Sequence, residues 1–300
     1  MQPKVTIGIP LYNEEKYIEE TVKSATNQSY TNIEILISDN GSTDGSLEIV
    51  NRIALSDSRI KIVSHTQNKG PFFNFKYLLD NAKGEYFIWL GGHDVMLPSF
   101  IEEAADTLNK DKSICAIFPK VYEILDDSIE EKFIHAQYRF KNPDDIGERL
   151  IQLIKTKGRG SAVHSVYRIS VLRKSLTDID GGDLMIFLKA ATYGKFVESE
   201  HLALYMRNVR PSESSTNQKN RYKAYGFKDN WRVIRYMFPF KLILSLDSLS
   251  FKEKIKLFSK VRKEMAIHGA YGTRKIFLYY LYRGQFKVSF VSLLERVMIK

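Results

Sequence analysis

The chain has 300 residues and a formal net charge of +10, and 44% of its residues are hydrophobic while 27% are charged. This composition supplies a sizeable apolar core and excludes an intrinsically disordered chain. The single cysteine, Cys115, excludes an internal disulfide framework and is typical of a protein in the reducing cytoplasm. Because Cys115 lies in an apolar run, we expect a buried and inert thiol. No run of about 18 uncharged apolar residues occurs, so we expect no membrane span.

Residues 4–46 predict a β-strand, a helix and a second β-strand, with a polar loop after each strand. The first strand alternates apolar residues and stops at Pro10, and the second is a short apolar run that stops at Ser38 and Asp39. Between them, apolar residues recur at helical spacing from Ile18 to Ala25. Ligands of such βαβ units bind beyond the carboxyl ends of the strands. Both polar loops are therefore expected to open into one crevice.

Helices and strands continue to alternate along the rest of the chain. We expect helices at 47–53, 71–82, from about 98, at 144–155 and after Asp183, and strands at 59–63, 85–90, 114–125, 132–140, 161–167 and 196–206. This order predicts an α/β fold with a mainly parallel sheet flanked by helices. Residues 210–218 have loop composition and separate an α/β domain, 1–210, from a basic helical extension, 211–300. Helical patterns in that extension cover 222–237, 251–268 and 273–283.

Three motifs occur in order: VTIGIPLYNEEKYIEETVKSATNQSY, IEILISDNGSTDGS and QNKGPFFNFKYLLDNAKGEYFIWLGGHDVMLP. Together they resemble the N-terminal half of family 2 inverting glycosyltransferases with the GT-A fold. The resemblance extends more weakly to about Arg207 and covers roughly two thirds of the chain. It implies an enzyme that moves a sugar from a nucleotide-diphosphate donor, a UDP-sugar, to a hydroxyl of a surface-glycan precursor such as capsule or O-antigen.

The resemblance also implies a set of donor-binding residues. The residues that would line the nucleoside and donor pocket are Pro10, Tyr12, Asn13, Glu14, Asp39, Asn68, Lys69 and Asn74. Among them, Asp39 would accept an N–H from the base. The alternative for Asn13 and Asp39 is that they only cap turns and helices, as Asn and Asp commonly do.

The usual metal-binding acidic pair of the family is replaced here by Gly91-Gly92-His93-Asp94. Counting back from Pro98, His93 occupies the position of the metal ligand and Asp94 follows it. We predict Mn²⁺ ahead of Mg²⁺, because Mg²⁺ strongly prefers oxygen ligands. The alternative is that His93 only forms hydrogen bonds and that the enzyme uses metal weakly or not at all.

The remaining predicted site residues lie in the second half of the chain. Asp183 resembles the family's general base, the carboxylate that takes the acceptor's hydroxyl proton in an inverting transfer. A plain helix N-cap is its alternative role. Many relatives have Tyr-Arg-x-His near the end of this domain, whereas this chain offers Arg207 and Arg210, which we predict at the diphosphate. The histidines that we expect to be structural are His135, His164 and His201.

The basic character of the chain is concentrated near its C-terminus. Residues 241–300 contain 13 Lys and Arg against 4 Asp and Glu, interleaved with Phe and Tyr. Basic helices with aromatic faces suit an anionic membrane surface, here the inner face of the cytoplasmic membrane, where a lipid-linked glycan acceptor would lie. The alternative is that the aromatic residues pack onto the domain. Nucleic acid is not expected, because the first half of the chain indicates a nucleotide sugar.

Two further functions stay open from the sequence. One is a metal-independent transferase of the same fold. The other is a catalytically degenerate subunit that binds a nucleotide sugar without turnover, since the paired acidic residues are missing.

Overall fold

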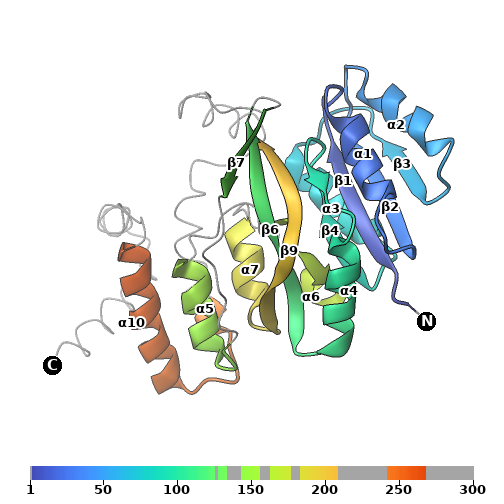
Figure 1. Ribbon diagram of the computed structural model, residues 1–300. Coiled ribbons are helices and arrows are strands. Elements are labelled where there is room, and N and C mark those ends of the chain that lie inside the picture. The colour runs from blue at the N-terminus through green and yellow to red at the C-terminus, as the bar shows by residue number, and fades with distance from the viewer. Residues whose placement is uncertain are drawn as a thin grey trace, which may run out of the picture.

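The computed structural model describes residues 2–125, 128–133, 143–155, 163–176, 183–208 and 242–267. In these residues, nine strands form one sheet in the order β3-β2-β1-β4-β8-β6-β9-β5, and β7 pairs with β6. Figure 1 shows the first strands at one end of the sheet and helices α5 and α10 beyond the other end.

The N-terminal part is a run of parallel strands joined by helices. Its elements are β1 (Val5–Leu11), α1 (Ile18–Thr26), β2 (Ile33–Asp39), α2 (Ser46–Ala54), β3 (Ile60–Ser64), α3 (Pro71–Asn81) and β4 (Tyr86–Trp89). Strand β1 pairs in parallel with β2 and with β4, and β2 pairs in parallel with β3. The carboxyl ends of these four strands therefore lie at one edge of the sheet.

The second part makes the sheet mixed. Its elements are β5 (Val95–Met96), α4 (Phe100–Lys110), β6 (Ile114–Leu125), β7 (Ser128–Phe133), α5 (Ile146–Lys155), β8 (Val166–Arg168), α6 (Ile169–Ser175), α7 (Asp183–Ala190), β9 (Lys195–Asn208) and α10 (Phe251–Ile267). Strand β8 is antiparallel to β4 and β6, β9 is parallel to β6, and β5 is antiparallel to β9. The predicted α/β class with a mixed sheet and flanking helices is confirmed, and among the described residues parallel and antiparallel strand pairs are equal in number.

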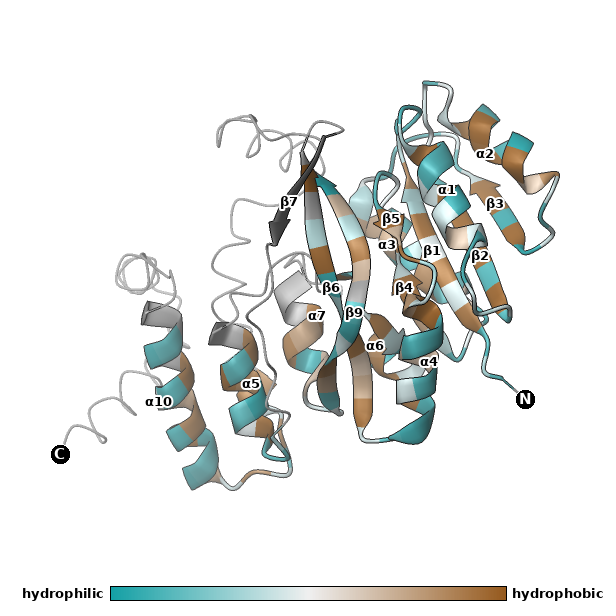
Figure 2. Cartoon of the chain, viewed as in Figure 1, coloured by the Kyte–Doolittle hydropathy of each residue, from teal (hydrophilic) through white to brown (hydrophobic). Residues whose placement is uncertain are grey.

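Helices cover both faces of the sheet, and strand side chains alternate between two apolar clusters. One cluster contains residues of α1, α2 and α4, and the other contains residues of α3, α5, α6, α7 and α10. In β4, Ile88 enters the first cluster, while Phe87 and Trp89 enter the second, as the two-residue period of a strand requires. Gly8 on the neighbouring strand makes room, because a Cβ there would lie 2.8 Å from the Phe87 ring. Figure 2 shows the apolar residues concentrated on the central strands.

Some boundaries differ from the sequence prediction. The strand expected at 132–140 is β7, which begins earlier at Ser128, and residues 134–140 lie outside the described part. The strand expected at 161–167 is reduced to β8, Val166–Arg168. Strand β5 was not predicted, because two residues are too few to show a strand period. The helical patterns at 222–237 and 273–283 lie outside the described residues.

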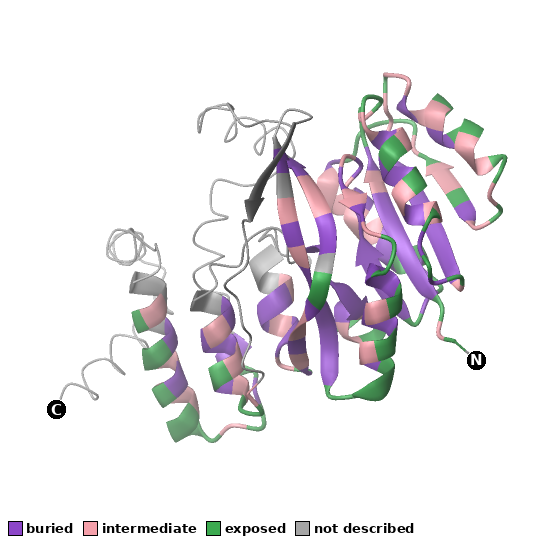
Figure 3. Ribbon diagram, viewed as in Figure 1, coloured by how far each residue is buried: buried purple, intermediate pink, exposed green. Residues whose placement is uncertain are grey.

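The described part of the C-terminal extension packs on the core of the domain. Leu242, Ile243, Leu257 and Val261 are buried in the same apolar cluster as β4 and α7, and α10 lies beside α5 (Figures 1 and 3). The buried residues are aliphatic, whereas the aromatic Phe251 is 58% exposed, so the packing expected for the aromatic residues stays a prediction, as does the boundary near residue 210. Among the described residues, no helix combines the length and the apolar character that crossing a membrane requires.

Cys115 on β6 is 1% exposed, and burial raises the pKa of its thiol to about 12. A thiol that stays protonated is a poor nucleophile, so the expectation of a buried, inert cysteine is confirmed.

Candidate nucleotide-binding site

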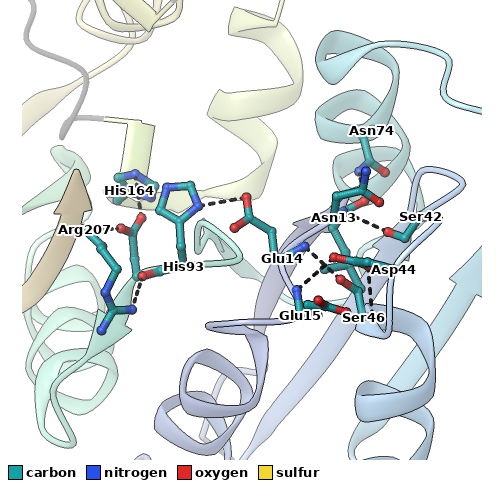
Figure 4. Close-up of polar contacts among 12 residues, drawn as sticks. Asn13, Glu14, Glu15, Ser42, Asp44, Ser46, Asn74, His93, His164 and Arg207 are labelled. Carbon is teal, nitrogen blue, oxygen red and sulfur yellow. Dashed lines mark hydrogen bonds and ion pairs between the residues drawn. The ribbon is translucent and has the colours of Figure 1, made fainter. Parts of the chain in front are cut away.

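The loops after β1 and β2 are tied together by reciprocal hydrogen bonds (Figure 4). The N–H of Asn13 donates to Ser42 Oγ at 3.0 Å, and the N–H of Thr43 donates back to Asn13 Oδ1 at 2.8 Å. Asn13 has a φ of 53°, a left-handed conformation that Asn tolerates better than most residues. The sequence predicted that these two polar loops lie close together. The structure shows that hydrogen bonds join them.

A second group of bonds continues this connection. The N–H of Glu14 donates to Ser46 Oγ at 2.8 Å, the N–H of Glu15 donates to Asp44 Oδ2 at 3.2 Å, and the N–H of Gly45 donates to Glu15 Oε2 at 2.7 Å. Burial alone raises the pKa of Asp44, but hydrogen bonds from Ser46 and from the N–H of Glu15 outweigh burial and lower it. These hydrogen bonds hold the backbone of the first loop in place. Tyr12 in the same loop is 37% exposed, so its ring is accessible to a ligand.

Asp39 ends β2 with both carboxylate oxygens engaged. Oδ1 accepts the N–H of Ser42 at 3.1 Å, and Oδ2 accepts the hydroxyl of Ser64 at 2.9 Å. The residue is 1% exposed. Asp39 thus caps the turn after β2, which was the alternative role expected from the sequence. Its contact with a base stays a prediction.

Asn40, the next residue, organises the crevice and was missed by sequence reasoning. Its amide donates to Asn68 Oδ1 at 2.9 Å and to the Gly70 carbonyl at 3.1 Å, and its Oδ1 accepts the N–H of Lys69 at 3.0 Å. Gly41 follows with a φ of 74°, and a Cβ there would lie 2.8 Å from the backbone of Gln67. The Asn-Gly pair was the available signal, because such pairs mark tight turns.

The two predicted contacts around α3 have different environments. Lys69 Nζ lies 4.6 Å from the centre of the Phe73 ring. Asn74 is 2% exposed, and its amide donates to the carbonyls of Ser38 at 2.9 Å and Leu11 at 3.4 Å. Its Oδ1 is buried without a hydrogen-bond partner in the described part of the chain. Asn74 therefore links α3 to the carboxyl ends of β1 and β2. Its role toward the nucleotide stays a prediction.

The loop after β4 meets the loop after β1 through His93. His93 Nδ1 lies 2.9 Å from Glu14 Oε1 (Figure 4). Gly92 allows this approach, because a Cβ there would lie 3.1 Å from Glu14 Cγ and 3.4 Å from the Pro10 carbonyl oxygen.

Asp94 turns away from this contact. Its Oδ1 accepts the N–H of Arg207 at 2.9 Å, and its Oδ2 lies 3.5 Å from His164 Nε2. His164 Nδ1 donates in turn to the Trp89 carbonyl at 2.8 Å. A Cβ on Gly91 would lie 2.4 Å from Asp94 Oδ2, so only glycine leaves room for the carboxylate. The apolar context of His164 in the sequence did not indicate this partner.

Arg207 at the end of β9 supports the same loop. Its guanidinium donates to the His93 carbonyl at 2.7 Å and to Glu20 Oε2 at 2.9 Å, and it lies 4.4 Å from the centre of the Tyr17 ring. Arg207 is 9% exposed. These contacts direct its charge toward the protein, and its predicted contact with a diphosphate stays a prediction. Arg210 lies outside the described residues.

The metal site expected at His93 and Asp94 stays a prediction, and the structure shows how the two side chains lie. The two side chains have separate partners, Glu14 for His93 and Arg207 with His164 for Asp94. Asp94 is also 2% exposed. Within the described ranges, no group of three or more His, Cys, Asp or Glu side chains could hold an ion. The two adjacent side chains in this turn therefore point in different directions.

Asp183 is the first residue of α7, where the sequence predicted a helix to begin. Its side chain lies outside what the structure describes. Its role as general base stays a prediction.

Comparison with known proteins shows the family of this chain. The model of the family described as "Glycosyl transferase family 2" matches residues 6–176. The chain belongs to glycosyl transferase family 2. An uncharacterized glycosyltransferase of Haemophilus influenzae is 34% identical to it over 156 residues, which are 50% of this chain and 48% of that protein. This chain spans less than half the length of that relative.

Solved structures of other proteins share the fold at low sequence identity. S. aureus TarS 1-349 in complex with UDP-GlcNAc superposes with a TM-score of 0.67 and 17% identity, over 95% of this chain and 77% of that chain. The mannosyltransferase PcManGT from Pyrobaculum calidifontis, in complex with GDP-Man and Mn²⁺, gives a TM-score of 0.50 and 16% identity, over 96% and 81%. The expected GT-A-like fold, a mixed sheet with flanking helices, is confirmed.

Proposed function

We propose that this chain is an inverting glycosyltransferase that moves a sugar from a UDP-linked donor to a hydroxyl of a surface-glycan precursor. The observation that carries the proposal is the meeting of three loops at the carboxyl ends of β1, β2 and β4, where hydrogen bonds join the loops after β1 and β2 and connect Glu14 to His93. Ligands of open α/β sheets bind at this edge. The TarS structure of the same fold contains UDP-GlcNAc, which supports a UDP-linked donor here.

Each part of the crevice has a role in this proposal. Tyr12, the exposed aromatic residue of the first loop, offers a face to the base, and Asp39 holds the turn beneath it. Asn68 and Lys69 are presented by Asn40 at the ribose and phosphate end. Asp183 takes the proton of the acceptor hydroxyl as the acceptor oxygen attacks the anomeric carbon.

The test is donor binding and turnover with the purified full chain. UDP-GlcNAc, other UDP-sugars and GDP-mannose are compared by calorimetry and by release of the nucleoside diphosphate, with Mn²⁺ and with EDTA. We expect binding and slow hydrolysis of a UDP-sugar. Absence of binding to every nucleotide tested would contradict the proposal.

A second candidate is a subunit that binds a nucleotide sugar without turnover. The observation that favours it is the loss of the paired acidic ligands, since His93 and Asp94 do not converge on one point. Tight UDP binding without hydrolysis or transfer to any acceptor extract would select this candidate.

The proposed acceptor is a lipid-linked glycan at the cytoplasmic face of the membrane. Helix α10 exposes Lys252, Lys256 and Lys260, and Phe251 at its start is 58% exposed. Exposed basic and aromatic side chains bind anionic lipid surfaces. Co-sedimentation with phosphatidylglycerol vesicles tests this: a Lys256→Glu/Lys260→Glu variant should bind less. The matched control, Lys110→Glu/Lys112→Glu, changes two exposed lysines elsewhere and should bind as wild type. Equal loss in both variants, or none, would argue against a specific surface.

A further inference from the structure

Glu198 on β9 is a partly buried carboxylic acid that no step of the proposed transfer uses. Its Oε1 is buried without a hydrogen-bond partner in the described part of the chain. Burial raises the pKa of this carboxyl above its usual 4.5, and the charge of Lys120 offsets only part of the rise. The Lys120 ammonium donates instead to the Glu200 carbonyl. Because an unpaired buried carboxyl lowers stability, its presence indicates a site for a ligand that donates a hydrogen bond.

Glu198 lies on the face of the sheet against which helix α7 packs. Phe196, two residues earlier on β9, packs against Phe187 of α7 with ring centres 6.0 Å apart, and alternate residues of a strand share a face. Phe118 is the register partner of Glu198 on β6 and is buried in the same apolar cluster as Phe187. Glu198 therefore continues the row of Phe196 toward the carboxyl end of β9.

Helix α7 brings Asp183 toward the same part of this face. At the end of α7, the Ala190 carbonyl accepts from Cys115 Sγ at 3.6 Å, near the amino end of β6. Asp183 is the first residue of α7 and lies one helical turn beyond Phe187. Helix α7, which lies beside β9 in Figure 1, therefore carries Asp183 in the direction in which β9 carries Glu198.

Two tyrosines extend this face toward the carboxyl ends of β6 and β9. Tyr122 and Tyr205 are register partners, and their rings are stacked at an angle of 25° with centres 6.1 Å apart. Val121 and Leu204, their neighbours in the chain, belong to the apolar cluster on the opposite face. The two tyrosines therefore share the face of Glu198, and both are partly exposed.

This face adjoins the donor crevice. Strand β8 is antiparallel to both β4 and β6, and β9 is parallel to β6, so the carboxyl ends of β4, β6 and β9 lie at one edge of the sheet. Arg207, two residues after Tyr205, donates to the His93 carbonyl in the loop after β4. The tyrosine pair is therefore close to the loops where the donor is proposed to bind.

We propose that this face of β6 and β9 binds the glycan of the acceptor. Glu198 accepts a hydrogen bond from a hydroxyl of the first sugar, and the Tyr122–Tyr205 pair packs against a sugar further along the glycan. The inference rests on the proposed glycosyltransferase function.

The chemistry of these side chains suits a sugar. A carboxyl oxygen accepts from a sugar hydroxyl in either of its protonation states. The C–H groups of a sugar ring pack on aromatic faces, and a few polar groups among aromatic rings are typical of ligand sites. Tyr122 lies about 13 Å beyond Phe118 along β6, so a single sugar at Glu198 does not reach the tyrosines. The acceptor is therefore an oligosaccharide.

The experiment measures glycoside binding to the full chain, with UDP present, by saturation-transfer NMR. The probes are methyl glycosides of glucose, galactose and N-acetylglucosamine and of a trisaccharide of each. We expect a trisaccharide to bind more tightly than its monosaccharide. Glu198→Met should weaken both about 10- to 100-fold, the loss expected for one hydrogen bond to a charged group. Tyr205→Leu should weaken only the trisaccharide, about 3- to 10-fold.

Two controls match these substitutions. Glu200→Met changes an exposed glutamate on the same strand, and Tyr193→Leu changes a tyrosine that is 48% exposed. Both should leave glycoside binding unchanged, and UDP affinity should stay unchanged in every variant. Glu198→Met should unfold at the wild-type temperature or above it, because it removes an unpaired carboxyl. Glu198→Gln keeps an acceptor oxygen and should weaken glycoside binding by a smaller factor.

Unchanged glycoside affinity in Glu198→Met would overturn the inference, and so would equal losses in Glu198→Met and Glu200→Met. If Glu198→Met does not fold, Glu198→Gln decides: wild-type glycoside affinity in that variant, or a loss of UDP affinity, would overturn the inference. A wild-type chain that binds UDP but no glycoside would overturn it and leave the proposed function standing. A wild-type chain that binds no nucleotide would instead refute the proposed function, and this inference with it.

Discussion

The backbone N–H of Arg207 donates a hydrogen bond to Asp94 Oδ1 at 2.9 Å and joins residues 113 positions apart in the chain. The bond connects the end of β9 to the loop after β4. The Arg207 side chain adds a second bond to the same loop at the His93 carbonyl. The position of His93 in the crevice therefore depends on a strand from the far end of the domain.

Asp94 should matter more for stability than for nucleotide contact. Replacing it with Ala leaves the N–H of Arg207 without its acceptor and removes the carboxylate beside the His164 ring, and should lower the free energy of unfolding by about 1–3 kcal/mol. Urea unfolding measures the change. Asp80→Ala, which removes only an exposed pair with Lys76, should cost under about 0.5 kcal/mol. Equal effects of the two substitutions would contradict the buried role of Asp94.

Gly91 should tolerate no side chain. In Gly91→Ala, the new Cβ would lie 2.4 Å from Asp94 Oδ2, so the carboxylate must leave its two partners. We expect a loss of about 1–3 kcal/mol in the free energy of unfolding, as for other overpacked sites. Gly45→Ala is the control, because its Cβ would meet the end of the exposed Glu15 side chain at 3.1 Å. If Gly91→Ala unfolds at the same urea concentration as wild type, the steric argument is wrong.

Asn40 should couple stability to donor binding. Asn40→Ala removes three hydrogen bonds to residues 68–70, and should cost about 2–3 kcal/mol at about 1 kcal/mol for each bond. UDP affinity should also fall, since Asn68 and Lys69 lose their support. Asn81→Ala, which removes one exposed bond to the Tyr77 carbonyl, should change neither quantity. A stable Asn40→Ala variant with wild-type affinity would show that these loops hold their positions without it.

Glu34 should make stability depend on pH. Burial alone raises the pKa of this carboxyl, but hydrogen bonds from the Thr6 hydroxyl, the N–H of Lys83 and Lys61 outweigh burial and hold it below 4.5. A group whose pKa is lower in the folded protein contributes stability above its unfolded pKa and loses it as the pH falls through the folded value. Glu34→Gln should therefore be less stable at neutral pH, and the difference should shrink below pH 4.5. Glu48→Gln, an exposed control, should show no such trend.

Asp183→Asn tests the general base. Loss of the carboxylate should lower the rate of transfer about 10²- to 10⁴-fold, the usual contribution of general base catalysis. UDP affinity should stay unchanged, because the base contacts the acceptor rather than the nucleotide. Full transfer activity in this variant would mean that another group takes the proton.

Much of the fold could be predicted because its signals are local. The alternation from Val5 to Leu11, the helical spacing from Ile18 to Ala25 and the continuous apolar run of β4 depend only on neighbouring residues. Strand β5 escaped prediction because two residues carry no period, and its pairing with β9 is made more than 100 positions away. The short length of β8 was not predicted either, because an apolar run does not show at which residue the pairing with a neighbouring strand begins or ends.

The sequence by itself determined the βαβ units, the family and the two loops that line the crevice, because strand and helix periods and short motifs are written in consecutive residues. Only the tertiary structure decided which polar side chains meet. It paired His93 with Glu14, and Asp94 with Arg207 and His164, although His93 and Asp94 are adjacent in the chain. The physical reason is that side-chain direction depends on the turn between strands and on glycines at positions 91 and 92, whose missing Cβ atoms leave the space that the two acids occupy.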